Sequence, residues 1–276
     1  MHMLFIGGGN MAGALVGGLI SRGTAPADIT VVDPSESQRE SLVSRFGVEV
    51  REAVDPTLIE GSALIVLAVK PQQMRAAVAS LQPSVSGQLI ISVAAGIRAS
   101  DLSRWLAGHR RIVRAMPNTP ALIGQGVTGL AAPVDLASGD RALAERILGT
   151  VGATVWVDDE RRLDAVTAVS GSGPAYVFLF IEALEAAAFR LGLGAHQARA
   201  LAIGTVSGAA QLAAQSAEPP ATLRERVTSK GGTTAVALAE FDAAGLRELV
   251  ARAVAAAERR SIELGDEFGA EPPRPE

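Results

Sequence analysis

The sequence contains no cysteine, and this absence removes several kinds of chemistry at once. Without a thiol the chain can form no disulfide, no thiolate metal site and no cysteine nucleophile. Because no feature of the composition points to an oxidising compartment, we expect a cytoplasmic protein.

The sequence also lacks an excess of positive charge and long uninterrupted hydrophobic runs. Lys and Arg total 25 against 29 Asp and Glu, a net charge of −4, so we expect no nucleic-acid partner. The apolar opening, residues 3–20, is punctuated by glycine and preceded by no Lys or Arg, which argues against a signal peptide. We expect no membrane span. Aromatic residues make up only 4%, so small aliphatic side chains must build the core.

Short aliphatic runs alternate with longer mixed segments through the first half of the chain. This alternation predicts a Rossmann-like α/β domain with a parallel sheet, and the helical periodicity that follows predicts an all-α second domain. The expected domains are residues 1–158 and residues 159–268, with a disordered tail at 269–276. The expected strands are 4–6, 29–32, 64–69, 89–93, 112–115, 127–131 and 153–157. The expected helices are 10–22, 35–46, 71–81, 99–108, 137–151, 161–169, 174–191, 195–215, 220–228, 234–243 and 246–264.

The clearest motif is Gly7-Gly8-Gly9-Asn10-Met11-Ala12, which directly follows the first expected strand and opens the first helix. In this G-x-G-x-x-A pattern the first glycine permits a tight turn and the second lets a pyrophosphate approach the backbone. The helix N-terminus then faces the anion. The motif predicts a dinucleotide site, whereas the alternative is a glycine-rich turn without a ligand.

Asp33 ends the second expected strand, where an acidic side chain commonly binds the adenosine ribose and favours NAD over NADP. Ser35 and Arg39 are close enough in sequence to receive a 2′-phosphate instead. Asp33 and Ser35 can also be interpreted as caps of the next helix. The sequence therefore leaves the choice between NADH and NADPH open.

Three further turns follow later strands at the same edge of the expected sheet, where α/β folds bind their ligands. Small residues in the first two turns favour contact with a flat nicotinamide. The third is a rigid turn that either contacts the ligand or only shapes the pocket. The three turns are Ala68-Val69-Lys70-Pro71, Ala94-Ala95-Gly96 and Met116-Pro117-Asn118-Thr119-Pro120.

The helical half contains two loops rich in glycine and hydroxyl groups, at residues 170–174 and 228–234. Loops that open onto helix N-termini offer free N–H groups and hydroxyl donors, which suits a carboxylate or phosphate. Helix capping explains either loop alone. The presence of both favours a pocket for an anionic substrate.

Side chains suited to proton transfer are scarce. None of the three histidines, His2, His109 and His196, lies in a motif, and the two lysines are Lys70 and Lys230. A dehydrogenase that acts on an alcohol needs a general base, usually His or Lys. Reduction of a C=N bond requires less, because the nitrogen can arrive already protonated. The scarcity of bases therefore favours a C=N substrate.

With these motifs in order, the chain resembles the pyrroline-5-carboxylate reductase family over nearly its whole length. The resemblance rests on residues 6–12, 68–71, 94–96, 116–120, 170–176 and 231–234. It implies reduction of L-pyrroline-5-carboxylate to L-proline with NADPH or NADH and without a metal. It also implies a homodimer of interlocked helical domains, sometimes assembled into larger rings.

The resemblance also implies residue roles. The dinucleotide would lie on Gly7, Gly9, Asn10, Met11 and Ala12, its nicotinamide ribose near Ala68 and Lys70, and its nicotinamide near Ala95 and Gly96. The substrate carboxylate would lie on Ser229, Gly232, Thr233 and Thr234, with the Thr234 hydroxyl near the ring nitrogen.

The chain departs from the family pattern at two positions. The family often has proline where Lys230 stands, and often lacks an acid where Asp33 stands. Two alternative functions stay open at this point. One is a β-hydroxyacid dehydrogenase that uses Lys230, and the other is a cofactor-binding regulator without turnover.

Overall fold

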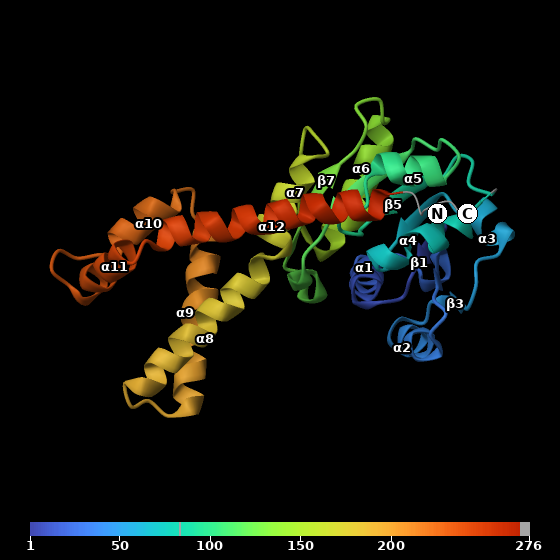
Figure 1. Ribbon diagram of the computed structural model, residues 1–276. Coiled ribbons are helices and arrows are strands. Elements are labelled where there is room, and N and C mark those ends of the chain that lie inside the picture. Colours follow the sequence, from blue (N-terminus) through green and yellow to red (C-terminus); the bar gives the residue numbers. More distant parts are fainter. Residues whose placement is uncertain (83, 271–276) are drawn as a thin grey trace, which may run out of the picture. The chain divides into compact units, whose positions relative to one another are not determined.

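The computed structural model describes residues 1–82 and 84–270, and the chain divides into two compact units (Figure 1). The first unit comprises Met1–Ser172 together with the chain from Ala256 onward, and the second is Gly173–Ala255. The first unit is built on a sheet, whereas the described second unit is helical.

Eight strands form one sheet in the order β3-β2-β1-β4-β5-β6-β7-β8. All neighbours are parallel except β6 and β7, which a short connection joins as an antiparallel pair. The parallel sheet confirms the predicted fold class. The strands are β1 (Met3–Ile6), β2 (Ile29–Val32), β3 (Glu49–Arg51), β4 (Leu64–Leu67), β5 (Leu89–Ser92), β6 (Ile112–Met116), β7 (Gly126–Ala131) and β8 (Gly152–Trp156).

Helices cover both faces of this sheet, which is why its central strands are apolar on both sides. On one face Phe5 and Val66 pack with Leu15 and Val16 of α1. On the other face Ile65 of β4 packs with residues of α4 and α5. The helices of this unit are α1 (Asn10–Ser21), α2 (Glu36–Phe46), α3 (Pro56–Glu60), α4 (Pro71–Ala79), α5 (Ala99–Trp105), α6 (Ser138–Leu148) and α7 (Arg162–Val166). Short 3-10 turns lie at Pro26–Asp28, Thr119–Ile123 and Gly149–Val151.

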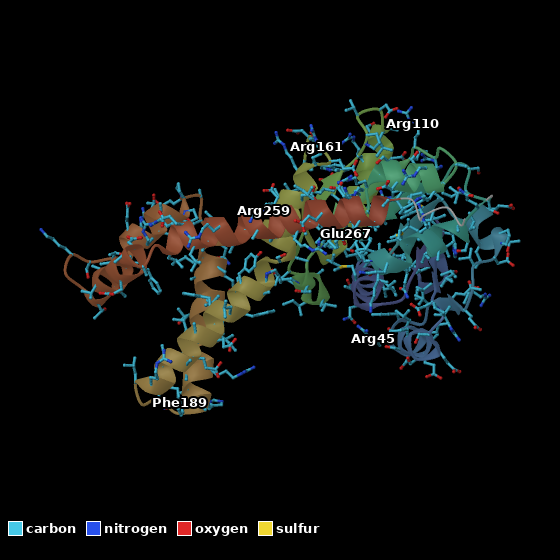
Figure 2. All side chains as sticks on the ribbon, viewed as in Figure 1. Arg45, Arg110, Arg161, Phe189, Arg259 and Glu267 are labelled. Atoms are coloured by element: carbon cyan, nitrogen blue, oxygen red, sulfur yellow. The ribbon has the colours of Figure 1, made fainter. Side chains whose placement is uncertain are left out.

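The second unit contains α8 (Gly173–Arg190), α9 (Ala195–Gln215), α10 (Pro220–Arg226), α11 (Thr233–Ala243) and the first part of α12 (Leu246–Gly269). Large apolar side chains on these helices are exposed, among them Phe178 and Leu179 at 64% and 66%. Figure 2 shows Phe189 near the C-terminal end of α8. A groove of about 610 Å³ between α8, α9 and α12 is lined almost wholly by apolar side chains, including Phe180 and Leu249. The described part of this unit therefore leaves much apolar surface uncovered.

The helical stretch Arg162–Arg190 is long and apolar enough to cross a membrane by length and composition alone. One such helix is weak evidence for a membrane protein, because an apolar helix in a protein interface has the same composition.

The contacts group α7 with the sheet because Leu163 is buried there and Val166 packs closely against Gly129 of β7. The expected domain boundary at residue 158 therefore remains a prediction. At the other end, α12 continues to Gly269, five residues beyond the expected end of this helix. Residues 271–276 of the expected disordered tail lie outside the described residues.

Candidate active site

The predicted dinucleotide residues gather at one edge of the sheet. Strand register pairs Ile6 with Leu67, and Leu67 with Ser92. Because β1, β4 and β5 are parallel and end level with one another, the turns that follow them are neighbours. The structure thereby brings Gly7–Ala12, Ala68, Lys70, Ala95 and Gly96 to a common edge.

Gly7 and Gly9 have different structural roles in the first turn. Gly7 has φ +98°, and a Cβ there would lie 2.7 Å from the carbonyl oxygen of Ala68. Gly9 has ordinary extended backbone angles, and a Cβ there would meet no described heavy atom within 4 Å. The fold therefore requires glycine at position 7, while the space beside Gly9 is open to a ligand.

Gly9 is also the N-cap of α1, and no described side chain caps this helix. Its first N–H groups, which begin at Asn10, lack partners of the kind that a serine or aspartate cap supplies. An uncapped N-terminus behind an open glycine suits a phosphate group.

Asp33 is held in place by the same turn. Its Oδ2 accepts a hydrogen bond from the Gly8 amide at 2.7 Å, and its Oδ1 accepts one from the Ser35 amide at 2.8 Å. Arg39 Nη1 donates to the carbonyl oxygens of Asp33 and Pro34 at 2.8 and 2.9 Å. Asp33 thus joins the first turn to the start of α2. The Ser35 side chain forms no capping bond to α2 among the described residues.

The turns after β4 and β5 are built of small residues. The Ala68 amide bonds the Ile6 carbonyl at 2.8 Å, which holds this turn against the first one. Lys70 is the exposed N-cap of α4. Gly96 has φ +72°, and a Cβ there would lie 3.2 Å from Phe268 and 3.4 Å from Leu264 of α12.

Asn118 connects the turn after β6 to the first glycine and hydroxyl loop. Its Nδ2 donates to the Ser170 carbonyl at 3.2 Å, and its Oδ1 accepts from the Val127 amide at 2.9 Å. Met116 packs against Gly171, where a Cβ would lie 2.5 Å from its Cε. The Asn118 amide is therefore already engaged in holding the fold.

The expectation of an open loop at residues 170–174 is wrong at both ends. Residues 170 and 171 belong to a π-helical turn, Thr167–Gly171, that is continuous with α7, and residues 173 and 174 begin α8. Such turns are rare, and the sequence gives no periodic signal for one.

The second predicted loop lies in the second unit and does open onto a helix. Gly231 has φ +72°, and the Gly232 amide bonds the Ser229 carbonyl at 3.0 Å, which closes a tight turn before α11. Gly232 is the N-cap of α11, with no side-chain cap among the described residues. Within the described chain the hydroxyl groups of Ser229, Thr233 and Thr234 form no hydrogen bond. This unit thus supplies backbone donors and three hydroxyl groups for an anion.

Sequence reasoning missed a partly buried ion pair that contacts the start of α5. Arg114 of β6 is 8% exposed and bonds Glu160 Oε1 at 2.8 Å. The same oxygen accepts from the Ala99 amide at 2.7 Å, at the first residue of α5. Glu160 lies far from Ala99 in sequence, so only the folded chain reveals this contact.

Two histidines have clear structural partners. His2 Nε2 lies 3.0 Å from Thr30 Oγ1, and His109 Nε2 lies 2.9 Å from the Gln88 carbonyl oxygen. Burial lowers the pKa of His109 below 6.5, and the nearby Arg111 charge lowers this pKa further. His109 precedes β6 and so lies at the opposite end of that strand from Met116.

Comparison with known families divides the chain in two. Residues 160–264 match the family described as pyrroline-5-carboxylate reductase dimerisation. Residues 2–96 match the family described as NADP oxidoreductase, coenzyme F420-dependent.

Curated relatives match over nearly the full length. Pyrroline-5-carboxylate reductase of Pseudomonas aeruginosa is 45% identical, with 97% of this chain and 98% of the relative covered. The protein of the same name from Pisum sativum is 38% identical, with 94% of each covered.

Solved structures of pyrroline-5-carboxylate reductases are also similar to nearly the whole chain. A pyrroline-5-carboxylate reductase from Coxiella burnetii has a TM-score of 0.90 and 40% identity, over 95% of this chain and 98% of that one. Pyrroline carboxylate reductase from Plasmodium falciparum with NADP bound has a TM-score of 0.84 and 28% identity, over 96% of this chain and 98% of that one.

Proposed function

The chain belongs to the pyrroline-5-carboxylate reductase family, and we propose how its own residues divide the reduction of L-pyrroline-5-carboxylate to L-proline. The enzyme uses NAD(P)H, which when bound supplies the hydride for the C=N carbon. The remaining tasks fall to the protein: holding the dinucleotide, holding the substrate carboxylate and contacting the ring nitrogen. Full-length relatives of one name favour this reaction over a Lys230-dependent dehydrogenase or a regulator without turnover.

The observation that carries the cofactor assignment is the open space beside Gly9 at the uncapped start of α1. We assign the pyrophosphate to the backbone N–H groups of Asn10, Met11 and Ala12. The neighbouring turns at Ala68 and Lys70 would hold the nicotinamide ribose, and Ala95 and Gly96 the nicotinamide. The small size of Ala95 and Gly96 leaves room for a flat ring against the backbone.

The substrate carboxylate is assigned to the turn before α11. Ser229 and Thr233 would donate hydrogen bonds to its oxygens, Gly232 would let the backbone come close to it, and the start of α11 would stabilise its charge. Thr234 lies in the first turn of the helix with its hydroxyl unengaged in the described chain. We assign this hydroxyl to the ring nitrogen, which changes from an imine to an amine during the reaction.

Replacement of Thr234 by alanine tests this assignment. If its hydroxyl contacts the nitrogen in the transition state, Thr234→Ala lowers kcat by roughly 10- to 100-fold, because one charge-assisted hydrogen bond is worth about 1.5–3 kcal/mol. The measurement is steady-state oxidation of NAD(P)H with pyrroline-5-carboxylate as the varied substrate.

Two matched variants complete the test. Thr234→Ser keeps a hydroxyl and should retain most of kcat, whereas Ser229→Ala should raise KM and leave kcat nearly unchanged. A raised KM with normal kcat in Thr234→Ala would limit this residue to carboxylate binding. Unchanged kinetics would show that the substrate lies elsewhere and would direct attention to Lys230.

We also propose that the enzyme works as a homodimer, with larger rings of dimers as a further assembly. The exposed apolar surface of α8 and α9 supports this, because a second copy can cover it. The match of residues 160–264 to a dimerisation family supports it independently. The same covering accounts for the apolar stretch Arg162–Arg190 without a membrane, and we propose a cytoplasmic location.

A further inference from the structure

The last turns of α12 lie directly on the loop that follows β5. A Cβ on Gly96 would lie 3.2 Å from Phe268 Cδ2 and 3.5 Å from the Gly265 amide nitrogen. A Cβ on Gly265 would in turn lie 3.1 Å from Arg98 Nη2. Glycine on both sides thus permits a close approach, and a larger residue at either position would require its neighbours to shift. We call residues 261–269 the α12 clamp.

Polar contacts fix the clamp at three places along its length. Ser261 Oγ bonds Asp164 Oδ1 at 2.6 Å, and Arg98 Nη2 lies 2.6 Å from Asp266 Oδ1. Arg104 Nη2 donates to the Gly269 carbonyl oxygen at 2.7 Å, where a cation also suits the C-terminus of a helix. Because these partners lie in α7 and at both ends of α5, the clamp has a defined position relative to the loop.

Ala94 at the start of the loop and Ile97 after it are packed in the core, but no polar or large side chain of the loop fixes Ala95 and Gly96 between them. Ala94, Ala95 and Gly96 present no side chain larger than a methyl group, and glycine enters the φ +72° region as readily as other regions. The conformation of this loop must therefore be imposed by its surroundings. Phe268 and Leu264 are the nearest atoms on the side where a Gly96 Cβ would point.

We infer that the α12 clamp positions the nicotinamide loop for hydride transfer, with Phe268 and Asp266 as positioning residues. This inference rests on the proposed placement of the nicotinamide at Ala95 and Gly96. Hydride transfer requires close and aligned reacting atoms, so a loop that is free to move should cost rate more than affinity. Most of the affinity should come from the separate Gly7–Ala12 turn.

The test compares Phe268→Ala and Asp266→Asn with Glu267→Gln. Glu267, labelled in Figure 2, lies next to Asp266 in sequence. It pairs with Arg260 of the same helix and is therefore the matched control. For Phe268→Ala we expect kcat, per bound dinucleotide, to fall roughly tenfold, with the Kd for NADPH changed less than about twofold. Asp266→Asn should show a smaller change of the same kind, because this ion pair is exposed. Phe268→Leu should restore most of the rate.

A deuterium isotope effect separates positioning from simple stabilisation. With NADPH deuterated at the transferred position, Phe268→Ala should show a larger isotope effect on kcat than the unmodified enzyme, because hydride transfer then limits turnover. An unchanged isotope effect and unchanged kcat per bound dinucleotide would overturn the inference, even if the melting temperature fell. The variant Ala95→Leu tests the underlying placement. If it leaves both kcat and NADPH affinity unchanged, the nicotinamide lies elsewhere. If Ala95→Leu lowers kcat or NADPH affinity while Phe268→Ala has the kinetics of the unmodified enzyme, the placement of the nicotinamide stands and only the inferred role of the α12 clamp is wrong.

Discussion

At the scale of single residues, two glycines of one turn should respond oppositely to the same substitution. Gly9→Val should weaken NAD(P)H binding severely and leave the melting temperature near its original value, because only the ligand site is open there. Gly7→Ala should instead destabilise the fold, since φ +98° and the Ala68 carbonyl both oppose a Cβ. Fluorescence titration of NAD(P)H together with thermal unfolding distinguishes the two effects. An unchanged affinity in Gly9→Val would place the cofactor elsewhere.

Asp33 should set the choice between the two dinucleotides. Its carboxylate would repel a 2′-phosphate, so we expect NADH to be used at least as well as NADPH. Asp33→Asn removes the charge and keeps an acceptor for the Gly8 amide, and should shift the ratio of kcat/KM toward NADPH by roughly tenfold, equivalent to about 1.4 kcal/mol. The check is kcat/KM with each dinucleotide. A strong NADPH preference that persists in Asp33→Ser would contradict this and implicate Ser35 and Arg39.

At the scale of elements, Asn118 should act as a structural connection between the turn after β6 and the π-helical turn. Asn118→Ala removes the hydrogen-bond partner of the Val127 amide and the Ser170 carbonyl, so the free energy of unfolding should fall by about 0.5–1.5 kcal/mol. Urea denaturation measures this change. Thr119→Ala, at an exposed neighbour, is the control and should change stability by less than about 0.5 kcal/mol. Equal stability of the two variants would contradict the assignment.

The elements that sequence patterns predicted well are those whose signal is local. Buried β-branched runs such as residues 64–67 and the glycine turn at residues 7–12 can be recognised from neighbouring residues alone. Strand β3, Glu49–Arg51, is absent from the predicted strands because it is short and contains two charged residues. Both features are common in a strand at the edge of a sheet. The approach of Phe268 to Gly96 could not be predicted, because it joins segments far apart in sequence. The candidate site was thus predictable in its motifs but not in the contacts that hold them.

At the scale of the whole molecule, dimerisation should depend on the exposed apolar side chains of the second unit. A charge at Leu179, which is 66% exposed on α8, should be tolerated by the isolated chain but not within an apolar interface. We therefore expect Leu179→Glu to shift the protein toward monomer in sedimentation or light scattering. Val134→Glu, at an exposed position of the first unit, is the control. A dimer that persists in Leu179→Glu would place the interface on another surface.

Stability of the folded chain should decline on mild acidification, with His109 as one identifiable contributor. Burial, reinforced by the Arg111 charge, lowers the pKa of His109 below its usual 6.5, so the unfolded chain binds a proton at this residue first. The contribution to stability is therefore complete above pH 6.5 and is lost as the pH falls through the lower pKa of the folded state. His109→Gln keeps a donor for the Gln88 carbonyl but cannot titrate. Its free energy of unfolding should therefore vary less between pH 7.5 and pH 5 than that of the unmodified protein, by the amount that the titration of this one residue contributes. Urea denaturation across this pH range, with His196→Gln at an exposed helix start as control, measures the difference. If both variants retain the pH dependence of the unmodified protein, the acid sensitivity arises from other groups.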